Sequence, residues 1–308
     1  MVEKDWWVCA ILKAVFQSRY ADSIIFKGGT SLSKAYNLID RFSEDIDLII
    51  DRHLLGFDQL ESKSQIKKLR RASGGFIINN FRQELINQLD QLGVDRKFYE
   101  IEYNDHIDDT SDPNTLEIHY QTVVPTDNVY IQQRVLLEMG ARSLTEPFET
   151  KSLISFLDHH YKDLDFTQPS FDVQVVIPTR TFIEKVLLLH EEFSKPDDKI
   201  RTDRLTMHLY DLDKIMKAGY GEMAIADNEL FETIVQHRKT VTSLRGMDYS
   251  NHVKGKLTIL PPDAIMEKWE ADYKTMLENM IIGESLKWEE LLRRIKDIEV
   301  RFNEMNLE

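Results

Sequence analysis

Two aspartates, Asp45 and Asp47, stand two positions apart at the start of the apolar run 46–50. If this run is a β-strand, side chains two positions apart project from the same face, so both carboxylates face one site. Mg²⁺ prefers oxygen ligands and commonly takes only one or two protein carboxylates, which leaves positions for phosphates and water. The pair therefore predicts a Mg²⁺ or Mn²⁺ site with Asp45 and Asp47 as catalytic ligands, suited to phosphoryl transfer.

A diglycine, Gly28 and Gly29, follows the apolar run 23–26 and precedes a helical pattern. Small residues at a strand-to-helix turn let backbone N–H groups approach a phosphate, and the helix N-terminus adds positive potential. Thr30 and Ser31 can add hydroxyl donors. Alone, a diglycine is usually a turn, and an Asp-x-Asp pair often occurs by chance on a solvated strand. Their succession along one short segment makes a nucleoside triphosphate site the favoured interpretation.

Lys185 is a third candidate, because it stands one turn inside a predicted helix among apolar neighbours. The first turn of a helix is unfavourable for a cation, so an anionic partner should compensate the ammonium group. A triphosphate is one such partner. The alternative is a salt bridge to Glu184, Glu138 or Asp211.

Two further acids complete the set of candidates. Glu138 lies in a predicted strand, where it can act as general base or metal ligand and deprotonate an acceptor hydroxyl. A buried structural acid paired with Arg134 or Arg142 explains it equally well. Helical periodicity puts Asp211 at the border of the core, and the alternative for Asp211 is an ordinary acid on a helix surface.

Apolar periodicity predicts the elements that must position these residues. Strands are expected at 23–26, 46–50, 97–103, 115–124, 129–139 and 171–177. Helices are expected at 7–18, 30–39, 58–92, 181–193, 204–217, 228–243, 264–282 and 285–306. Within these, Thr30 or Ser31 is expected to cap one helix, Thr181 and Glu184 to form the capping box of another, and Gly74-Gly75 to break a third.

The charge composition limits which nucleic acids this protein can bind. The 308 residues carry 39 basic and 53 acidic side chains, a formal net charge of −14, so nucleic acid is repelled on average. We expect no DNA partner, and an RNA must meet a local basic patch. The best candidate patch is the cluster of Lys63, Lys67, Lys68, Arg70 and Arg71. The alternative interpretation of this cluster is an ordinary solvated helix face.

The single cysteine, Cys9, cannot form an internal disulfide, which fits a reducing compartment and a role in core packing. No window approaches the roughly 20 apolar residues that a membrane-spanning helix needs. We therefore expect a soluble, cytoplasmic protein with no membrane partner.

Two segments carry a family resemblance, 26–34 with the sequence FKGGTSLSK and 41–48 with the sequence RFSEDIDL. They resemble the first two motifs of the AbiEii toxin nucleotidyltransferases, a family in the DNA polymerase β-like superfamily that includes the MenT toxins. Fifteen residues separate Gly29 from Asp45, a spacing closer to the AbiEii variant than to the minimal superfamily pattern. The resemblance implies contacts to the nucleotide from Lys27, Gly28, Gly29, Thr30 and Ser31.

Two later segments extend the resemblance to about residue 215. Residues 178–185, PTRTFIEK, are similar to the lysine motif of the family, and residues 208–212, HLYDL, to its final aspartate motif. The resemblance implies that Lys185 contacts the triphosphate and that Asp211 supports the catalytic site. No family motif is recognisable beyond these segments.

The resemblance implies an α/β (α+β) nucleotidyltransferase fold with a mixed sheet flanked by helices. We expect a nucleotidyltransferase domain over 1–177 and a mainly helical domain over 178–308 that completes the active site.

The implied activity is transfer of a nucleotide from an NTP to an acceptor with release of pyrophosphate. The implied setting is a type IV toxin–antitoxin or abortive-infection pair, with an AbiEi-like antitoxin and RNA, such as tRNA, as acceptor. The alternatives are transfer to a small molecule or a protein, and a nucleotide-binding module without turnover.

Overall fold

The computed structural model describes residues 1–41, 43, 45–60, 62–103, 113–123, 132–162 and 164–304. The chain forms two compact units. The first comprises residues 1–36 and 43–176, and the second comprises residues 37–42 and 177–308. A single boundary near residue 177 therefore does not account for the short stretch 37–42, which groups with the carboxyl-terminal unit.

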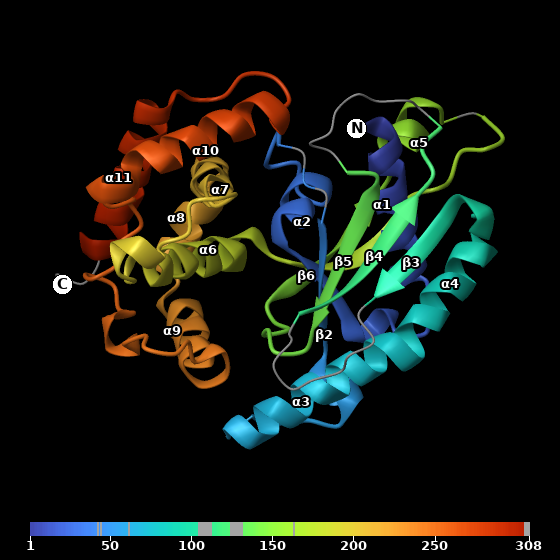
Figure 1. Ribbon diagram of the computed structural model, residues 1–308, viewed down its shortest axis with the longest axis horizontal. Helices are drawn as coiled ribbons and strands as arrows, with labels where there is room; N and C mark the ends of the chain where they lie inside the picture. The colour runs from blue at the N-terminus through green and yellow to red at the C-terminus, as the bar shows by residue number, and fades with distance from the viewer. Residues whose placement is uncertain are drawn as a thin grey trace. The chain divides into compact units, whose positions relative to one another are not determined.

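The first unit is built on a mixed sheet with the strand order β3-β4-β5-β2-β1-β7-β6 (Figure 1). The pairs β2–β5 and β1–β7 are parallel, and the other neighbours are antiparallel. This confirms the predicted mixed sheet. The strands are β1 (Ile24–Lys27), β2 (Asp45–Ile50), β3 (Tyr99–Tyr103), β4 (Asn114–Tyr120), β5 (Arg134–Gly140), β6 (Phe148–Leu153) and β7 (Phe171–Val176).

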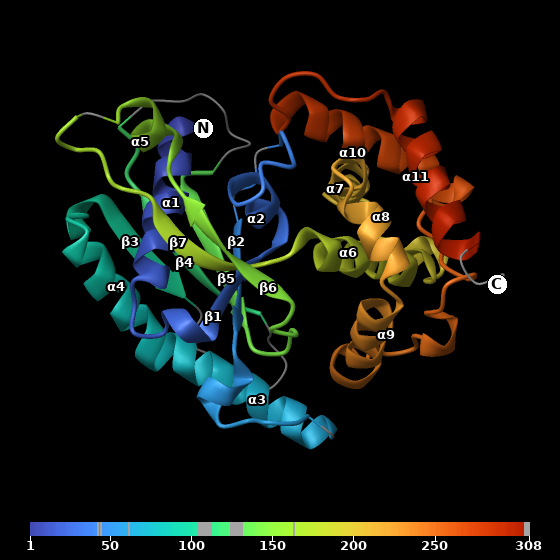
Figure 2. The ribbon, with the colours of Figure 1, turned by 180° about the vertical axis from the view of Figure 1, so that it is seen from behind.

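Helices flank this sheet. The first of them, α1, packs against β5, β7 and α4, as the view from behind shows (Figure 2). The α-helices of the unit are α1 (Val2–Phe16), α2 (Gly28–Lys34), α3 (Lys63–Phe76), α4 (Arg82–Gln91) and α5 (Phe156–His160). A π-helical segment, η3 (Ile77–Phe81), joins α3 to α4. The 3-10 turns are η1 (Ala21–Ser23), η2 (Arg52–Leu55) and η4 (Arg96–Phe98).

The second unit is helical. Its α-helices are α6 (Pro178–Phe193), α7 (Thr206–Lys217), α8 (Tyr220–Ala226), α9 (Asn228–His237), α10 (Met266–Asn279) and α11 (Trp288–Glu304). The 3-10 turns are η5 (Asp197–Lys199), η7 (Tyr249–Asn251) and η8 (Asp263–Ile265), and a π-helical segment, η6 (Arg238–Thr242), follows α9. Phe302 of α11 stacks on Phe182 of α6 with ring centroids 6.0 Å apart. Stretch 37–42 is tied to this unit because Ile282 donates its N–H to the Asp40 carbonyl.

Three predictions about helix ends and breaks are wrong: the N-cap of α2, the break at Gly74-Gly75 and the capping box of α6. The N-cap of α2 is Lys27, without a side-chain hydrogen bond, and this helix ends at Lys34. Gly74 and Gly75 do not break a helix, because α3 runs through both and the irregularity is the π-helical segment after it. Glycine inside a helix costs only about 1 kcal/mol, which packing elsewhere can offset.

The capping box expected from Thr181 and Glu184 is also wrong. Helix α6 starts earlier, with Ile177 as its N-cap and Pro178 at its first turn. Proline is well suited to that position because its missing N–H has no intrahelical partner there. Glu184 instead accepts a hydrogen bond from Arg180. Strand β6 and helices α5 and α8 were not predicted. Phe42 and Glu44 of the second motif, and the adjoining ends of the predicted strands 115–124 and 129–139, lie outside the described residues.

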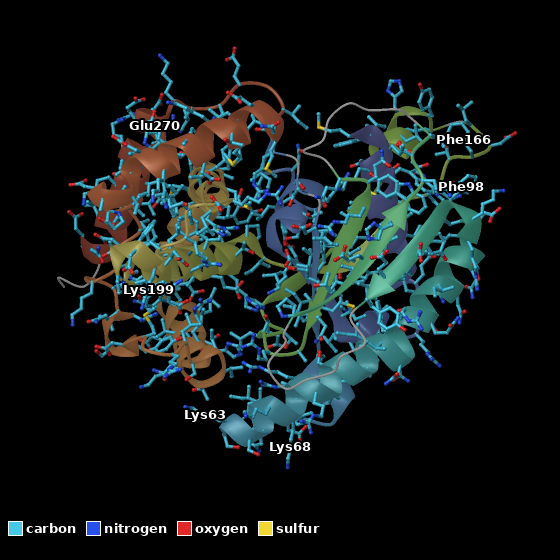
Figure 3. All side chains as sticks on the ribbon, in the orientation of Figure 1. Lys63, Lys68, Phe98, Phe166, Lys199 and Glu270 are labelled. Atoms are coloured by element: carbon cyan, nitrogen blue, oxygen red, sulfur yellow. The ribbon has the colours of Figure 1, made fainter. Side chains whose placement is uncertain are left out.

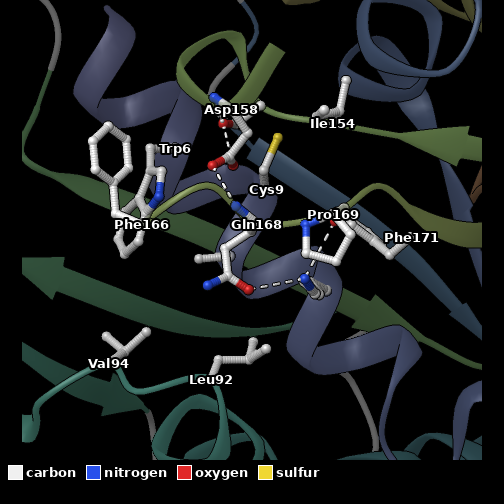
Figure 4. Close-up of a pocket in the computed structure, with 13 residues that line it drawn as sticks. Trp6, Cys9, Leu92, Val94, Ile154, Asp158, Phe166, Gln168, Pro169 and Phe171 are labelled. Atoms are coloured by element: carbon white, nitrogen blue, oxygen red, sulfur yellow. Dashed lines mark hydrogen bonds between the residues drawn. The ribbon is translucent and has the colours of Figure 1, made fainter. Parts of the chain in front are cut away.

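Cys9 lies in the core of the first unit beside a small cavity of about 80 Å³ (Figure 4). Burial, with the nearby charge of Asp158, raises the pKa of the thiol to about 12. The group therefore stays protonated, and the expected packing role is confirmed. Lys13 closes this region by donating to Gln168 Oε1 and the Pro169 carbonyl. Among the helices described, none has the length and apolar character needed to cross a bilayer.

Candidate active site

Asp47 is the centre of a row of charged residues across three neighbouring strands. Antiparallel β1 and β2 pair Lys27 with Asp47, and parallel β2 and β5 pair Asp47 with Glu138. Residues opposite one another on adjacent strands project from the same face, and Asp45 joins that face from two positions earlier. The predicted shared face of the two aspartates is therefore present, with Glu138 beside it.

The two faces of β2 differ in exposure. Ile46 and Leu48 are buried in the core, whereas Asp45 and Asp47 between them are only half-buried. This alternation follows from the period of two along a strand, which turns one face to the core and the other away. The aspartates thus remain accessible while apolar packing holds the strand that carries them.

The pKa of Glu138 reflects the closeness of the carboxyl groups of Asp45 and Asp47. Burial, the charges of Asp47 and Asp45, and a hydrogen bond with Asp47 together raise the pKa of Glu138 to about 7, although Lys27 opposes the shift. Mutually repelling carboxylates on one face form an environment that a cation would stabilise. Arg134, one of the expected alternative partners of Glu138, pairs with Glu117 instead.

Gly28 brings the diglycine turn against this cluster. Its φ of +79° lies in the left-handed region, and a Cβ atom built on it would stand 2.0 Å from Asp47 Oδ2 and 2.8 Å from Asp47 Cγ. Only glycine satisfies both the backbone conformation and the close approach. The turn and the Asp47 carboxylate therefore converge on one place, as the sequence predicts.

The neighbouring hydroxyl groups have partners within the protein. Thr30 donates to the Asp45 carbonyl and lies 2.9 Å from Ser43 Oγ, and Ser31 donates to the Gly28 carbonyl over 2.8 Å. Both side chains are buried. They fix the diglycine turn and the start of β2 relative to each other. Lys27 donates to Ser143 Oγ over 3.2 Å, and Gly29 lies half-buried in the first turn of α2.

The donor set fits a hard divalent cation. Asp45, Asp47 and Glu138 offer only carboxylate oxygens, the ligands that Mg²⁺ and Mn²⁺ prefer. Mg²⁺ commonly takes only one or two protein carboxylates and completes its shell with phosphate oxygens and water. Within the described ranges, no group of three or more His, Cys, Asp or Glu side chains is placed to hold a metal ion.

Lys185 and Asp211 meet inside the second unit. Lys185 Nζ lies 2.9 Å from Asp211 Oδ2 and 3.2 Å from His208 Nδ1. Arg41 donates to both oxygens of Asp211, each over 2.8 Å. The salt bridge from Lys185 to Asp211, one of the expected alternatives, is present. The alternative interpretation of Asp211 as an ordinary acid on a helix surface is wrong, because Asp211 is fully buried.

Neighbouring cations keep the carboxylate of Asp211 charged. Burial alone would raise the pKa of Asp211, but the charges and hydrogen bonds of Arg41 and Lys185 hold it well below its usual range. Burial, reinforced by Lys185, lowers the pKa of His208 far enough to leave a neutral imidazole. Asp211 thus pairs with Arg41 and Lys185 at the same time.

Sequence reasoning did not select Arg41 or His208 as functional residues. Both belong to the segments that carry the family resemblance, Arg41 at the start of the second and His208 at the start of the last. The sequence feature that could have pointed to Arg41 is its place just before the segment that contains Asp45 and Asp47. The partner of Arg41 is Asp211, 170 positions away along the chain. Tertiary folding brings the two together, and sequence periodicity does not reveal such a pairing.

A family model described as "Nucleotidyl transferase AbiEii toxin, Type IV TA system" matches residues 10–294. Among solved structures, MenT4, a nucleotidyltransferase toxin from Mycobacterium tuberculosis, is similar with 18% sequence identity and a TM-score of 0.41. That alignment covers 97% of this chain and 91% of the MenT4 chain. No curated protein matches. The informative comparison is the family match, which spans nearly the whole chain.

Proposed function

The chain belongs to the AbiEii family of type IV toxin nucleotidyltransferases, and from this premise we propose that it transfers a nucleotide from a metal-bound NTP to RNA. The enzyme class follows from the family. The metal, the nucleotide-binding residues and the acceptor are the parts proposed here.

The contact between Gly28 and Asp47 carries the proposal. The Asp47 carboxylate lies 2.0 Å from the place where a Cβ atom on Gly28 would stand, so the diglycine turn lies directly beside the proposed metal ligands. We assign Asp45 and Asp47 as ligands of Mg²⁺ or Mn²⁺ and the backbone at Gly28 and Gly29 as the phosphate cradle. Thr30 and Ser31 hold that cradle in shape.

The reaction is an in-line displacement. The oxygen of the acceptor hydroxyl bonds to the α-phosphorus while the bond from this phosphorus to the oxygen bridging to the β-phosphate breaks, and pyrophosphate leaves. Glu138, beside Asp47, accepts the proton of the acceptor hydroxyl. When bound, the divalent cation polarises the α-phosphate and neutralises the leaving group.

Lys185 is proposed to bind the triphosphate. Its Nζ has three N–H donors and two partners among the described residues, Asp211 and His208. The remaining N–H donor of this ammonium group suits a phosphate oxygen. Asp211 and Arg41 then hold Lys185 in place within the helical unit.

The acceptor and the setting rest on the family alone. We propose RNA, such as tRNA, as acceptor and an AbiEi-like antitoxin as the cognate partner. Transfer to a small molecule or a protein uses the same nucleotide end of the site, and a module without turnover binds NTP without releasing pyrophosphate.

The test is incubation of purified protein with Mg²⁺, each α-labelled NTP and total RNA. We expect labelled RNA and pyrophosphate, both lost in Asp45→Asn and Asp47→Asn. The matched control is Asp58→Asn, the same change at a carboxylate whose side chain is 91% exposed, which retains activity. Transfer that persists at the wild-type rate in Asp47→Asn contradicts the mechanism. Labelled protein or small molecule in place of labelled RNA selects the corresponding alternative.

A further inference from the structure

Helix α3 is an anomaly of charge in an acidic protein. Residues 62–83 contain six basic and no acidic side chains, whereas the whole chain has a net charge of −14. Surfaces that mix both signs are the norm for soluble domains. A stretch of six turns with basic side chains only gives this surface a local positive potential that attracts anions.

The basic side chains share one outward face. At about 100° per residue, Lys63, Lys67, Lys68 and Arg71 fall within an arc of about 140° around the helix axis. All four are exposed, while Ile66 and Leu69 on the opposite side are buried. We call these four residues the α3 basic face. Lys63 and Lys68 extend from the outer part of this helix in Figure 3.

Part of this face lacks internal ion pairs. Lys63, Lys68 and Arg71 have no acidic partner among the residues described. Elsewhere in the same unit, exposed cations such as Arg96 pair with a neighbouring carboxylate. Unpaired cations in a row present positive potential to the solvent instead of to the protein.

Gly75 is a second, independent observation on the same face. It lies inside α3, about 120° around the axis from Lys63 and so between Arg71 and Lys68. A Cβ atom at Gly75 would meet nothing within 4 Å, and its φ is not in the left-handed region. Packing and backbone conformation therefore give no reason for a glycine, which weakens a helix relative to alanine. Close approach of a ligand backbone is the remaining physical reason.

The chemistry of the face favours a nucleic-acid backbone over other polyanions. A helix that inserts into an anionic membrane needs exposed apolar side chains beside its cations. In α3, Ile66 and Leu69 are buried, and Ala72 and Phe76 are half-buried. A protein interface relies on aromatic or aliphatic anchors at its centre, and this face has none. Closely spaced Lys and Arg side chains are what a sugar–phosphate backbone requires.

The scaffold connects this face to the reaction centre within one unit. Strand β2 with Asp45 and Asp47 leads through η2 into α3, and α3 packs against β5, the strand of Glu138. We propose that the α3 basic face, with Gly75 as its point of closest approach, binds the sugar–phosphate backbone of the RNA acceptor away from the nucleotide that reacts. That this RNA is the acceptor of the reaction rests on the proposed function. That the α3 basic face binds a sugar–phosphate backbone does not depend on that function.

The test measures binding separately from catalysis. A fluorescent tRNA transcript is titrated with the full chain by anisotropy, without NTP and across a range of salt concentrations. Lys63→Gln, Lys68→Gln and Arg71→Gln are combined in one variant. The matched control combines Lys217→Gln, Lys256→Gln and Lys268→Gln, three exposed lysines outside α3, which changes the net charge equally.

We expect the α3 variant to bind the transcript at least about tenfold more weakly and to lose roughly 2–3 units from the slope of log affinity against log salt. The control variant keeps the wild-type slope. Equal losses in both variants, or none in the α3 variant, overturn the proposal. Binding to vesicles of phosphatidylglycerol and phosphatidylcholine without binding to RNA also overturns it.

Gly75→Leu supplies a variant with unchanged charge. Leucine favours the helix, so we expect an equal or higher Tm together with weaker RNA binding. A higher Tm with wild-type RNA binding would show that the glycine has no part in the surface.

Activity then separates the two proposals. If the wild type labels no RNA, the proposed function fails while the binding result still stands or falls by itself. If it labels RNA, the α3 variant should show a raised KM for the full transcript and an unchanged kcat.

Discussion

Asp47 Oδ2 occupies the space that a β-carbon on Gly28 would need, since the two positions are only 2.0 Å apart. The relationship joins a turn that begins α2 to the centre of β2, and it makes the shape of the turn and the direction of the carboxylate depend on each other. Neither can change alone.

Replacing Gly28 by alanine tests this dependence. The methyl group must displace Asp47, and alanine at positive φ costs a further 1–2 kcal/mol or so. We expect nucleotidyl transfer to fall about 100-fold or more, because misplacement by 1 Å at a reacting centre has effects of that size. Initial rates with labelled NTP and urea unfolding measure the two effects.

Gly93→Ala is the matched control. Gly93 has a φ of +80°, nearly that of Gly28, but its Cβ position has no neighbour within 4 Å. It should lose similar stability from backbone strain and keep wild-type activity. Equal activity losses in both variants would mean that the contact with Asp47 has no catalytic consequence.

The carboxylate cluster predicts a pH dependence of stability in EDTA. The pKa of Glu138 is raised to about 7 from 4.5, so between these values the folded protein holds a proton that the unfolded chain releases. Its stability therefore falls as pH rises from 4.5 to 7. Allowing for solvent screening, we expect a loss of about 1–2 kcal/mol in the wild type relative to Glu138→Gln.

Thermal unfolding across this pH range, with and without Mg²⁺, measures the effect. At pH 7.5 Mg²⁺ should raise the Tm of the wild type more than that of Glu138→Gln, because the cation relieves a repulsion that the variant lacks. Identical pH profiles for the two proteins in EDTA would contradict the assignment of crowded carboxyl groups.

The buried ion pair between Arg41 and Asp211 predicts a large loss of stability on its disruption. Asp211→Asn leaves two cations, Arg41 and Lys185, without their carboxylate, and breaking such a pair typically costs 3–5 kcal/mol or so. The pKa of Asp211 is held below its usual range, so this contribution is present above pH 4 and is lost as the pH falls through the folded pKa. Urea unfolding at pH 7 measures the loss in Asp211→Asn, and a pH series downward from pH 4 follows the decline of the difference between the two proteins.

Asp90→Asn is the comparison for this pair. Asp90 also accepts hydrogen bonds from an arginine, Arg96, but on the surface. Surface pairs contribute little because water screens them, so this variant should unfold like the wild type. A small loss in Asp211→Asn, equal to that of Asp90→Asn, would refute the importance of burial at position 211.

The family resemblance implied the mixed sheet. The shared face of Asp45 and Asp47 and their convergence with the diglycine turn were predicted from the residues themselves, because each follows from a local period or from one short segment. The start of α2 was mispredicted because Thr30 and Ser31 use their hydroxyl groups on the Asp45 and Gly28 carbonyls instead of capping. Strand β6 alternates exposed and half-buried residues without an apolar stripe. The partnership of Arg41 with Asp211 depends on tertiary folding across 170 positions, which no local pattern encodes.

Lys185→Gln separates a structural from a nucleotide-binding role. If Lys185 only stabilises the helical unit, the variant should lose stability as Asp211→Asn does. The structure argues otherwise, because Asp211 keeps both hydrogen bonds from Arg41 when Lys185 is removed, and the variant also removes a cation that is costly to bury. We therefore expect a Tm near that of the wild type. Affinity for an NTP analogue with a non-transferable α-phosphate should fall about 10- to 100-fold, the value of one charge-assisted hydrogen bond. Calorimetric titration in Mg²⁺ measures this affinity, and wild-type affinity in a folded Lys185→Gln variant would remove Lys185 from the triphosphate site.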